Sequence, residues 1–477
     1  MPQVIVMGAG PAGLAAAMVL AESGVEVAVL DKDVTEPPET AIGAWEEWTR
    51  PGVAQFRQAH TILPRGRAVI ESRLRTVWEY LESLGAHRFD MLDTRPRTMT
   101  EWSELPDDEK FQSLGARRPV YELAFALAAR EKGIDVRRGV GVASLATGAS
   151  VIDGIPHVTG VETSDGDTLD ANLVLDAAGR RSPLAALLTE IGSNPMTEDA
   201  EDSRFAYYTR FYRKRSGGDF PRPYVASLLP AGSISILTLP GDNDTWSVTL
   251  YATTADKKMR AVRDPEVFER VARSIKARAE WLEGDPVTGV DVMAGISDRE
   301  RSLIVEGLPV ATGVVPLSDA WACTNPSLGR GITMAMMHVD AFVPSISDHV
   351  DSPRDVAELW HTATETFVQP WHRATLSADR ARNREMDAVR TGLVDPAGVS
   401  STAVDKQDSQ DLAFFSAMMS SQHAYRAGLE IGGLFATPQE VMARPEVQTA
   451  VAAAAADLPQ FPPPAFASRN ELESLLG

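Results

Sequence analysis

Three glycines near the start of the chain have a spacing that suits phosphate binding by backbone N–H groups. Gly8, Gly10 and Gly13 come directly after the apolar run Val4–Met7, and the helix-forming stretch Leu14–Leu20 follows them. A buried strand, a glycine-rich turn and a helix in this order predict the first unit of a dinucleotide-binding fold. Gly8 would allow the tight turn, Gly10 the close approach of backbone to pyrophosphate, and Gly13 the packing of helix on strand.

A carboxylate stands where the ribose of such a dinucleotide would lie. Asp31 ends a second, mainly apolar run, Val25–Leu30, at the distance from the glycines that the fingerprint requires. A carboxylate accepts a hydrogen bond from a 2′-hydroxyl and repels a 2′-phosphate, so FAD or NAD is favoured over NADP. This first motif does not separate FAD from NAD.

Two later acids also follow apolar runs. Asp176 comes after Leu173–Leu175 and before Gly179, and Asp319 comes after an apolar run within Leu308–Val315. A ribityl chain on Asp319 and a flavin ring over the turn behind it would use this arrangement, because a helix N-terminus stabilises negative charge on the ring. FAD is therefore favoured, since a simple NAD-dependent dehydrogenase would not need this segment. The turn and the helix after Asp319 contain Pro326, Gly329, Gly331 and the stretch Thr333–Val343.

This second motif resembles the FAD fingerprint of flavoprotein monooxygenases of the aromatic-hydroxylase (para-hydroxybenzoate hydroxylase-like) fold, whose usual form is GDAxxxxxPxxGxG. Arg118 opens a segment similar to the one that places an arginine over the cofactor in that family. Residues 50–60 resemble the RxGVPQxRHxH segment of flavin epoxidases from polyether pathways. Ser318, Ala54 and Gln58 stand where these relatives usually have glycine, proline and histidine.

Together the motifs and the resemblance predict a set of FAD contacts along the chain. Asp31 and Asp319 would bind the cofactor's sugars, and Arg50 and Arg118 would lie near its phosphates or ring. The predicted cofactor-binding residues are Gly8, Gly10, Gly13, Asp31, Arg50, Arg118, Asp176, Gly179, Asp319, Pro326, Gly329 and Gly331.

The resemblance implies a reaction that the flavin itself carries. Reduced FAD would add O₂ to give a flavin hydroperoxide, and the protein would hold an apolar unsaturated small molecule nearby while excluding water. The product would be an epoxide or a hydroxylated ring. No catalytic triad is expected, and His60 is the one candidate for a catalytic side chain, through a flavin or substrate contact. NADH or NADPH would supply electrons, directly or through a flavin reductase, because the chain has one dinucleotide fingerprint.

Other flavin functions remain open or are disfavoured. An FAD-dependent reductase of a prenyl-like double bond and a non-catalytic flavin-binding protein are alternatives. A halogenase, by resemblance, needs a lysine after the first βαβ unit and a WxWxIP segment. No lysine occurs between Lys32 and Lys110, and no WxWxIP segment occurs in the sequence. Halogenation is therefore disfavoured.

The middle of the chain changes to the period-2 pattern of β-strands. Phe205–Tyr212 alternates between two side-chain sets, and three similar runs follow, separated by Pro- and Gly-containing turns. We expect an antiparallel sheet that roofs the substrate cavity, with substrate contacts from Tyr208, Arg210 and Tyr212. The acidic run Glu198–Asp202 is expected to be a solvated loop. The three further predicted strands are Tyr224–Leu229, Ile234–Leu239 and Trp246–Tyr251.

These elements predict an α/β protein with a Rossmann-like FAD-binding domain, an inserted antiparallel-sheet domain and a helical C-terminal region. The FAD-binding domain would comprise residues 1–195 and 300–350, the substrate domain residues 196–299, and the helical region residues 351–477. The helical region would pack on the FAD domain or cap the substrate entrance.

Composition narrows the partners. The 477 residues include 46 Lys and Arg against 66 Asp and Glu, which gives a formal net charge of −20 and disfavours nucleic acid and anionic membranes as partners. Cys323 is the one cysteine, so no disulfide can form within the chain. We expect no metal site. Without a recognisable signal peptide or a run long enough to span a bilayer, we expect a soluble, cytoplasmic protein.

Overall fold

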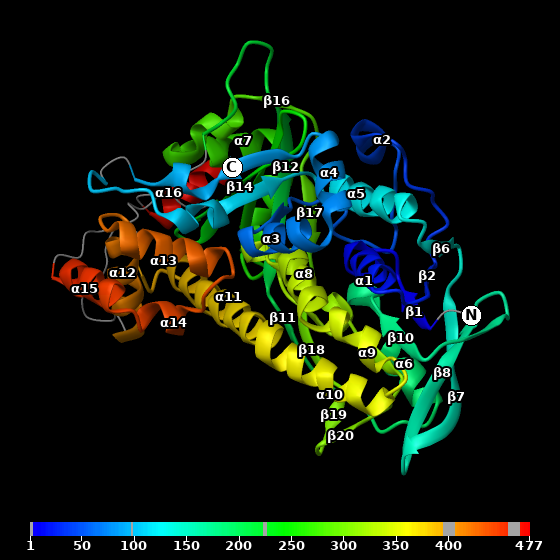
Figure 1. Ribbon diagram of the computed structural model, residues 1–477. Helices are drawn as coiled ribbons and strands as arrows, with labels where there is room; N and C mark the ends of the chain where they lie inside the picture. The colour runs from blue at the N-terminus through cyan, green and yellow to red at the C-terminus, as the bar shows by residue number, and fades with distance from the viewer. Residues whose placement is uncertain (1–2, 97–98, 223–226, 395–405, 457–467) are drawn as a thin grey trace.

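The computed structural model describes residues 3–96, 99–222, 227–394, 406–456 and 468–477. It shows mixed sheets and many helices, which confirms the predicted α/β class (Figure 1). No helix in these ranges is long and apolar enough to cross a membrane.

A five-stranded parallel sheet lies at the centre of the largest hydrophobic core. Its strand order is β21-β10-β1-β2-β6, so the strand at the first glycine motif lies between the strands that end at Asp31 and Asp176. Because parallel strands are buried on both faces, all four residues of β1 are buried. The strands are β1 (Val4–Met7), β2 (Val27–Asp31), β6 (Asp135–Arg138), β10 (Leu173–Asp176) and β21 (Val314–Pro316).

Helices and a meander complete this core. The helices α1 (Pro11–Glu22), α5 (Arg118–Glu131) and α8 (Gly331–Phe342) pack together beside the sheet, and the antiparallel meander β7-β8-β9 packs against β10. In Figure 1 the β7–β8 hairpin extends from the end of the molecule nearest the N-terminus. The meander strands are Val142–Ile152, Ile155–Thr163 and Thr168–Asp170, and nearby helices are α3 (Pro64–Arg73), α4 (Arg75–Ser83), α6 (Leu184–Glu190), α9 (Ile346–His349) and α10 (Pro353–Ala363).

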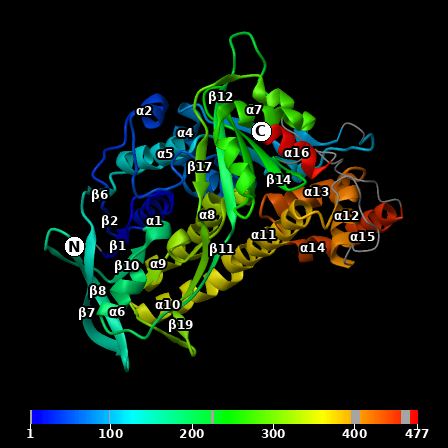
Figure 2. The same cartoon turned by 180° about the vertical axis from the view of Figure 1, so that it is seen from behind.

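A second, antiparallel sheet of six strands lies beside the first. Its order is β13-β14-β15-β12-β16, and β17 also pairs with β12 (Figure 2). The predicted alternation in β12 is therefore confirmed as a strand with two different faces. The strands are β12 (Phe205–Arg213), β13 (Leu228–Ala231), β14 (Ile234–Pro240), β15 (Thr245–Thr253), β16 (Asp285–Pro286) and β17 (Asp291–Ala294).

Helices cover the even-numbered face of β12. Phe268 on α7 (Pro265–Ser274) and Leu472 on α16 (Arg469–Leu476) share a hydrophobic core with Tyr208 and Tyr212. Arg469 also contacts Asp256, with an Nη1–Oδ2 distance of 2.6 Å. The C-terminal helix thus returns to a sheet formed much earlier in the chain.

The predictions for residues 198–202 and 224–229 have different outcomes. The acidic run predicted as a loop is instead a strand, β11 (Thr197–Asp202), paired with β18 (Ser297–Ser302). The acidic strand is favoured because β18 carries arginines, and Arg301 Nε lies 2.9 Å from Glu198 Oε2. Of the predicted strand 224–229, residues 224–226 lie outside the described residues.

Small sheets and helices fill the rest of the fold. A sheet β3-β5-β4 precedes α5, and β22 extends the β11–β18 pair. The strands are β3 (Thr61–Ile62), β4 (His87–Asp90), β5 (Gln112–Gly115), β19 (Ile304–Val305), β20 (Leu308–Pro309) and β22 (Ala322–Cys323), and α2 is Ala41–Glu46. The domain division at 195, 300 and 350 stays a prediction.

The last third is helical, as expected. The long helix α11 (Gln369–Arg390) packs against the antiparallel sheet at β14 and β15, and a cluster of four helices lies near one end of it (Figure 1). Arg426 on this cluster contacts Asp108, with an Nη2–Oδ2 distance of 2.7 Å. The four helices are α12 (Lys406–Met418), α13 (Gln422–Gly432), α14 (Pro438–Met442) and α15 (Pro445–Ala455).

A buried ion pair joins the antiparallel sheet to the segment before α5. Arg117, directly before α5, places Nε 3.0 Å and its backbone N 2.8 Å from Oδ1 of Asp242, in the turn between β14 and β15. The two side chains are 2% and 0% exposed. Because both charged groups are removed from water, each needs the other to compensate its charge.

We predict that D242A lowers the free energy of unfolding by about 3–5 kcal/mol, because Arg117 would keep a buried, uncompensated charge. Urea unfolding measures the change. The exposed pair Arg75–Glu79 is the control, since E79A should cause a clearly smaller loss. Equal effects of D242A and E79A would contradict a special role for the buried pair.

Candidate cofactor-binding site

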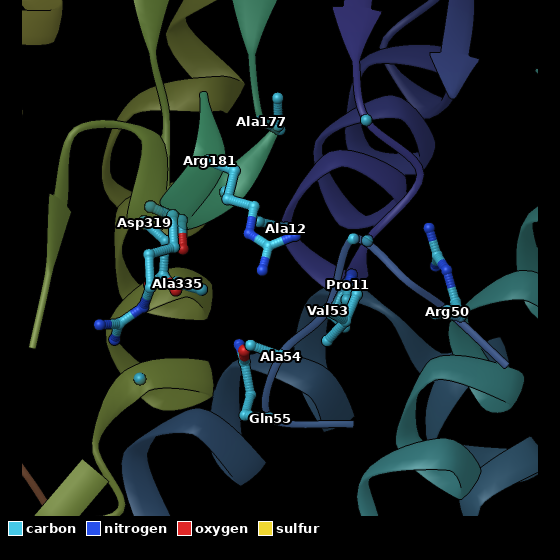
Figure 3. A pocket seen from close by; sticks show the side chains of 18 of the residues that line it. Pro11, Ala12, Arg50, Val53, Ala54, Gln55, Ala177, Arg181, Asp319 and Ala335 are labelled. Carbon is cyan, nitrogen blue, oxygen red and sulfur yellow. The ribbon is translucent and has the colours of Figure 1, made fainter. Parts of the chain in front are cut away.

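A groove with a cavity volume of about 530 Å³ runs past the carboxyl ends of the parallel strands (Figure 3). Residues that end or follow four of these strands line it, including Met7, Asp31, Ala177 and Leu317. Open α/β sheets bind ligands at this edge, and the volume is that of an ordinary small-molecule site.

The groove brings together most of the predicted cofactor residues. They come from both ends of the predicted FAD-binding region and lie along one continuous wall. The predicted residues that line it are Gly8, Gly10, Asp31, Arg50, His60, Arg118, Gly179, Asp319, Pro326, Gly329 and Gly331.

The first glycine turn has the geometry expected of it. Gly8 has φ of +104°, and a Cβ atom there would lie 2.6 Å from the carbonyl oxygen of Ala177. A Cβ atom on Gly13 would lie 2.0 Å from the carbonyl oxygen of Gly8, so the helix can approach the strand only with glycine at this position. A Cβ atom on Gly10 would meet nothing within 4 Å, because it would point into open space.

The N-terminus of α1 opens onto the groove. Gly10 is its N-cap and offers no side-chain acceptor, Pro11 occupies the first turn, and no acidic residue lies in that turn. The free N–H groups of this turn and the helix dipole favour an anion such as a pyrophosphate.

Buried charges organise the Asp31 end of the groove. Arg50 places Nη2 2.6 Å from Asp31, Nε 3.0 Å from Asp33 and Nη1 2.8 Å from Glu122. Glu122 also accepts a hydrogen bond from Arg118, at 2.8 Å. Arg50 therefore neutralises and orients the predicted ribose-binding carboxylate, whose Oδ2 also accepts from the backbone N–H of Ala9 at 2.9 Å.

The other end of the groove is a turn. Asp319 lies three residues after the end of β21, and the residues Pro326–Leu328 form a short 3₁₀ turn before Gly329, which has φ of +64°. Ser318 has φ of +56°, a region that glycine prefers, so the departure from the family motif leaves the turn intact with a strained residue.

His60 lies at this turn end and is uncharged. Its Nδ1 lies 2.9 Å from the backbone carbonyl oxygen of Gln58. Burial and, to a smaller extent, the positive charge of Arg118 lower the pKa of His60 to about 3. The ring is therefore neutral at any physiological pH.

Two predicted cofactor residues lie behind the groove. Gly13 packs α1 on β1, as described above. Asp176 is fully buried, and its carboxylate accepts hydrogen bonds from the Ala178 N–H at 2.9 Å and from the Ser182 hydroxyl. Burial raises the pKa of this carboxyl. The structure therefore gives Asp176 a role in shaping the turn and no access to the groove.

The predicted substrate residues lie on the far face of β12. Tyr208 and Tyr212 pack in the core under α7, and Arg210 places Nη1 3.0 Å from Glu269 on that helix. The alternate residues of β12, Tyr207 and Thr209, face the groove side. There the Thr209 hydroxyl donates to Gln58 Oε1 at 3.0 Å, and the Tyr207 hydroxyl donates to Asn325 Oδ1 at 2.6 Å.

Sequence reasoning missed several lining residues. Arg181 projects toward the N-terminus of α1 (Figure 3), although it follows a motif whose acid and glycine were both considered. The segment Met293–Ile296 also lines the groove, and no motif marks it. Within the described part of the chain, none of the lining residues comes from 351–477, and no group of three or more acidic, histidine or cysteine side chains could hold a metal.

Comparisons with known proteins agree with this geometry. Residues 1–45 match the model of a family described as an FAD binding domain. PqsL from Pseudomonas aeruginosa, a probable FAD-dependent monooxygenase, is 14% identical, with a TM-score of 0.56 over 81% of this chain and 99% of that one. OxyS, an anhydrotetracycline hydroxylase from Streptomyces rimosus, is 17% identical, with a TM-score of 0.51 over 82% and 71%.

The chain has the fold of FAD-dependent monooxygenases. The same fold also occurs in the flavin-dependent brominase Bmp2, which is 14% identical with a TM-score of 0.56 over 95% of this chain and 98% of that one. No curated protein matches the sequence. The FAD-binding domain begins with the strand, glycine turn and helix described above.

We predict that G10V abolishes retention of FAD while the protein still folds, because the new side chain would enter only the open groove. The affinity for FAD should fall at least about tenfold, because the backbone can no longer approach the pyrophosphate. Flavin absorbance after gel filtration measures retention. G289V is the control, since Gly289 is exposed and open but lies away from the groove. A yellow, FAD-loaded G10V protein would contradict the assignment.

A buried polar cluster supports the turn at residues 326–329 from behind. The carboxylate of Asp379 on α11 accepts a hydrogen bond from the Ser327 hydroxyl, and the carboxylate of Asp298 accepts one from the backbone N–H of Asn325. Asp379 and Asp298 are 4% and 1% exposed. Burial raises the pKa of Asp379 to about 7 and that of Asp298 to about 6.

This cluster makes stability depend on pH. A carboxyl whose pKa is raised by folding stabilises the fold fully below its unfolded pKa, near 4, and loses that contribution as the pH rises through about 7. D379N should therefore be more stable than the wild type at pH 8, by about 1–3 kcal/mol, and similar at pH 4. Urea unfolding at both pH values measures this. D153N, in an exposed turn, is the control, and parallel pH profiles for D379N and wild type would contradict the prediction.

Proposed function

We propose that the chain is a monooxygenase that inserts one oxygen atom of O₂ into an apolar unsaturated small molecule. The observation that carries the proposal is the single groove that joins the glycine turn at residues 8–13 to the turn at residues 326–331. A ligand that reaches both turns must be long and must carry a phosphate group at one end. FAD fits, since its pyrophosphate suits the N-terminus of α1 and its ring suits the second turn.

Each part of the groove has a distinct task in this proposal. Asp31, held by Arg50, would bind the adenosine ribose, and Asp319 would bind the ribityl chain. Pro326, Gly329 and Gly331 would leave room for the ring. Arg118 would remain a charge near the phosphates or ring, and Gly179 would form part of the wall. The groove-facing side of β12 and the segment Met293–Ile296 would hold the substrate and exclude water.

FAD, when bound and reduced, supplies the activation of O₂. One oxygen atom enters the substrate as an epoxide or hydroxyl group, and the other leaves as water. A hydride from NADH or NADPH and one proton from solvent balance the reaction. The donor would react directly with this protein, or a separate flavin reductase would reduce the flavin. His60, neutral at the turn end, can orient a substrate by hydrogen bonding but does not take up a second proton at physiological pH.

Bromination is not part of the proposal, although a brominase shares the fold. By the family resemblance that chemistry requires a lysine near the flavin. Among the described residues that line the groove, Lys32 is the one lysine, and it follows Asp31 at the end away from the second turn.

Rapid mixing of the reduced holoprotein with O₂ tests the proposal. A monooxygenase should give a transient absorbance at about 370–390 nm before oxidised flavin returns. Oxidation of NADH and NADPH by the protein alone, with and without an added flavin reductase, identifies the electron donor.

The control for this experiment is free reduced flavin in the same buffer. Reoxidation without a transient, together with anaerobic saturation of a prenyl double bond, would overturn oxygenation in favour of a reductase. Reoxidation without a transient and without any product would favour a non-catalytic flavin-binding protein.

A further inference from the structure

Two side chains at the turn end of the groove have fixed hydrogen-bonding directions. The backbone carbonyl oxygen of Gln58 can only accept, so the proton of the neutral His60 ring lies on Nδ1, which is 2.9 Å from that oxygen. The second ring nitrogen, Nε2, then carries a lone pair and can only accept. The low pKa of the ring, about 3, keeps this state over the physiological range.

The Gln58 side chain is fixed in the opposite sense. Its Oε1 accepts from the Thr209 hydroxyl at 3.0 Å, and the Thr209 oxygen lies 2.9 Å from that of Thr249. With the Gln58 amide oriented as the structure shows it, Thr209 gives its proton to Gln58, and Thr249 then donates to Thr209. This chain of hydroxyls engages the amide oxygen and leaves the amide N–H groups as donors.

Both residues line the groove, and in the part of the chain that the structure describes neither Nε2 atom has a protein hydrogen-bond partner. The cavity that they line also includes the apolar side chains of Met293, Ile296 and Pro326, and the charge of Arg118 lies close enough to act on His60. A polar group that leaves water for such a place must recover its hydrogen bonds there.

We propose that His60 and Gln58 form a donor–acceptor pair that recognises an uncharged hydroxyl group on the otherwise apolar substrate. A hydroxyl can donate to His60 Nε2 and accept from Gln58 Nε2. An ether or ketone only accepts and leaves His60 unpaired, whereas a carboxylate accepts and also brings a buried charge. This inference names the substrate class of the proposed monooxygenase and rests on that proposed function.

Binding to the oxidised holoprotein tests the pair without turnover. The probes are 1-naphthol, 1-methoxynaphthalene, naphthalene and 1-naphthoate, and the change in the visible flavin absorbance reports binding. The wild type should bind 1-naphthol about tenfold more tightly than each of the other three, because only the hydroxyl satisfies both side chains. Equal affinities, or no binding of 1-naphthol, would overturn the proposal.

Variants assign the preference to the pair. Q58L should reduce the affinity for 1-naphthol about tenfold and leave that for naphthalene unchanged. T209V removes the hydroxyl that orients the amide and should weaken the preference, whereas the matched variant T209S keeps the hydroxyl and should retain it. A preference that survives in both Q58L and T209V would overturn the assignment.

Two further outcomes separate this inference from neighbouring ones. If Q58L weakens FAD binding and leaves the preference for the hydroxyl unchanged, Gln58 contacts the cofactor and the proposal fails. If the wild type forms the transient with O₂ but shows no preference among the probes, oxygenation stands and this inference alone fails. If the preference is present without any transient, the hydroxyl site stands and oxygenation fails.

Discussion

The contact between Gly13 and the carbonyl oxygen of Gly8 decides where α1 begins, and the groove depends on that point. A single carbon atom on Gly13 would overlap that oxygen, so the helix could not approach β1 closely. With glycine there, the first turn of α1 reaches the edge of the sheet beside Asp31. The free N–H groups of the helix and the carboxylate on the next strand then face one cavity.

The opposite wall of the groove depends on how the second sheet is held. The buried pair Arg117–Asp242 ties the β14–β15 turn to the chain just before α5, whose first turn carries Arg118 toward the groove. The predicted cofactor contact Arg118 and the antiparallel sheet are therefore linked through adjacent residues. A shift of either sheet would alter both, because the interior is too closely packed to deform at one wall alone.

Much of the cofactor end of the groove could be predicted from sequence, because its physical requirements act on neighbouring residues. A turn that must approach phosphate needs glycines at fixed spacing, and Asp31 must end the next strand. The residues of β12 that face the groove were harder to predict. The alternation in β12 indicated two faces, yet both are buried, one under α7 and one toward the groove, so hydrophobicity could not show which one met the site. The sequence therefore indicates Tyr208 as a substrate contact, although Thr209 is the residue whose side chain contacts Gln58 in the structure.

Long-range pairing explains the remaining differences. The acidic run at Glu198 has the composition of a loop, and only its distant partner Arg301 makes it a strand. Asp176 ends a strand like Asp31, but Ser182 six residues later closes over it. The first outcome depends on a partner that is distant in the sequence, and the second on the local turn that brings Ser182 over the carboxylate.

The return of α16 to α7 has a consequence for synthesis. Residues 265–274 leave the ribosome well before residues 469–476, so the part of this core that Leu472 and Leu476 cover stays open while all the intervening helices are made. Exposed apolar surface on a partly made chain favours aggregation. The order of translation therefore leaves this core open until α16 has been made.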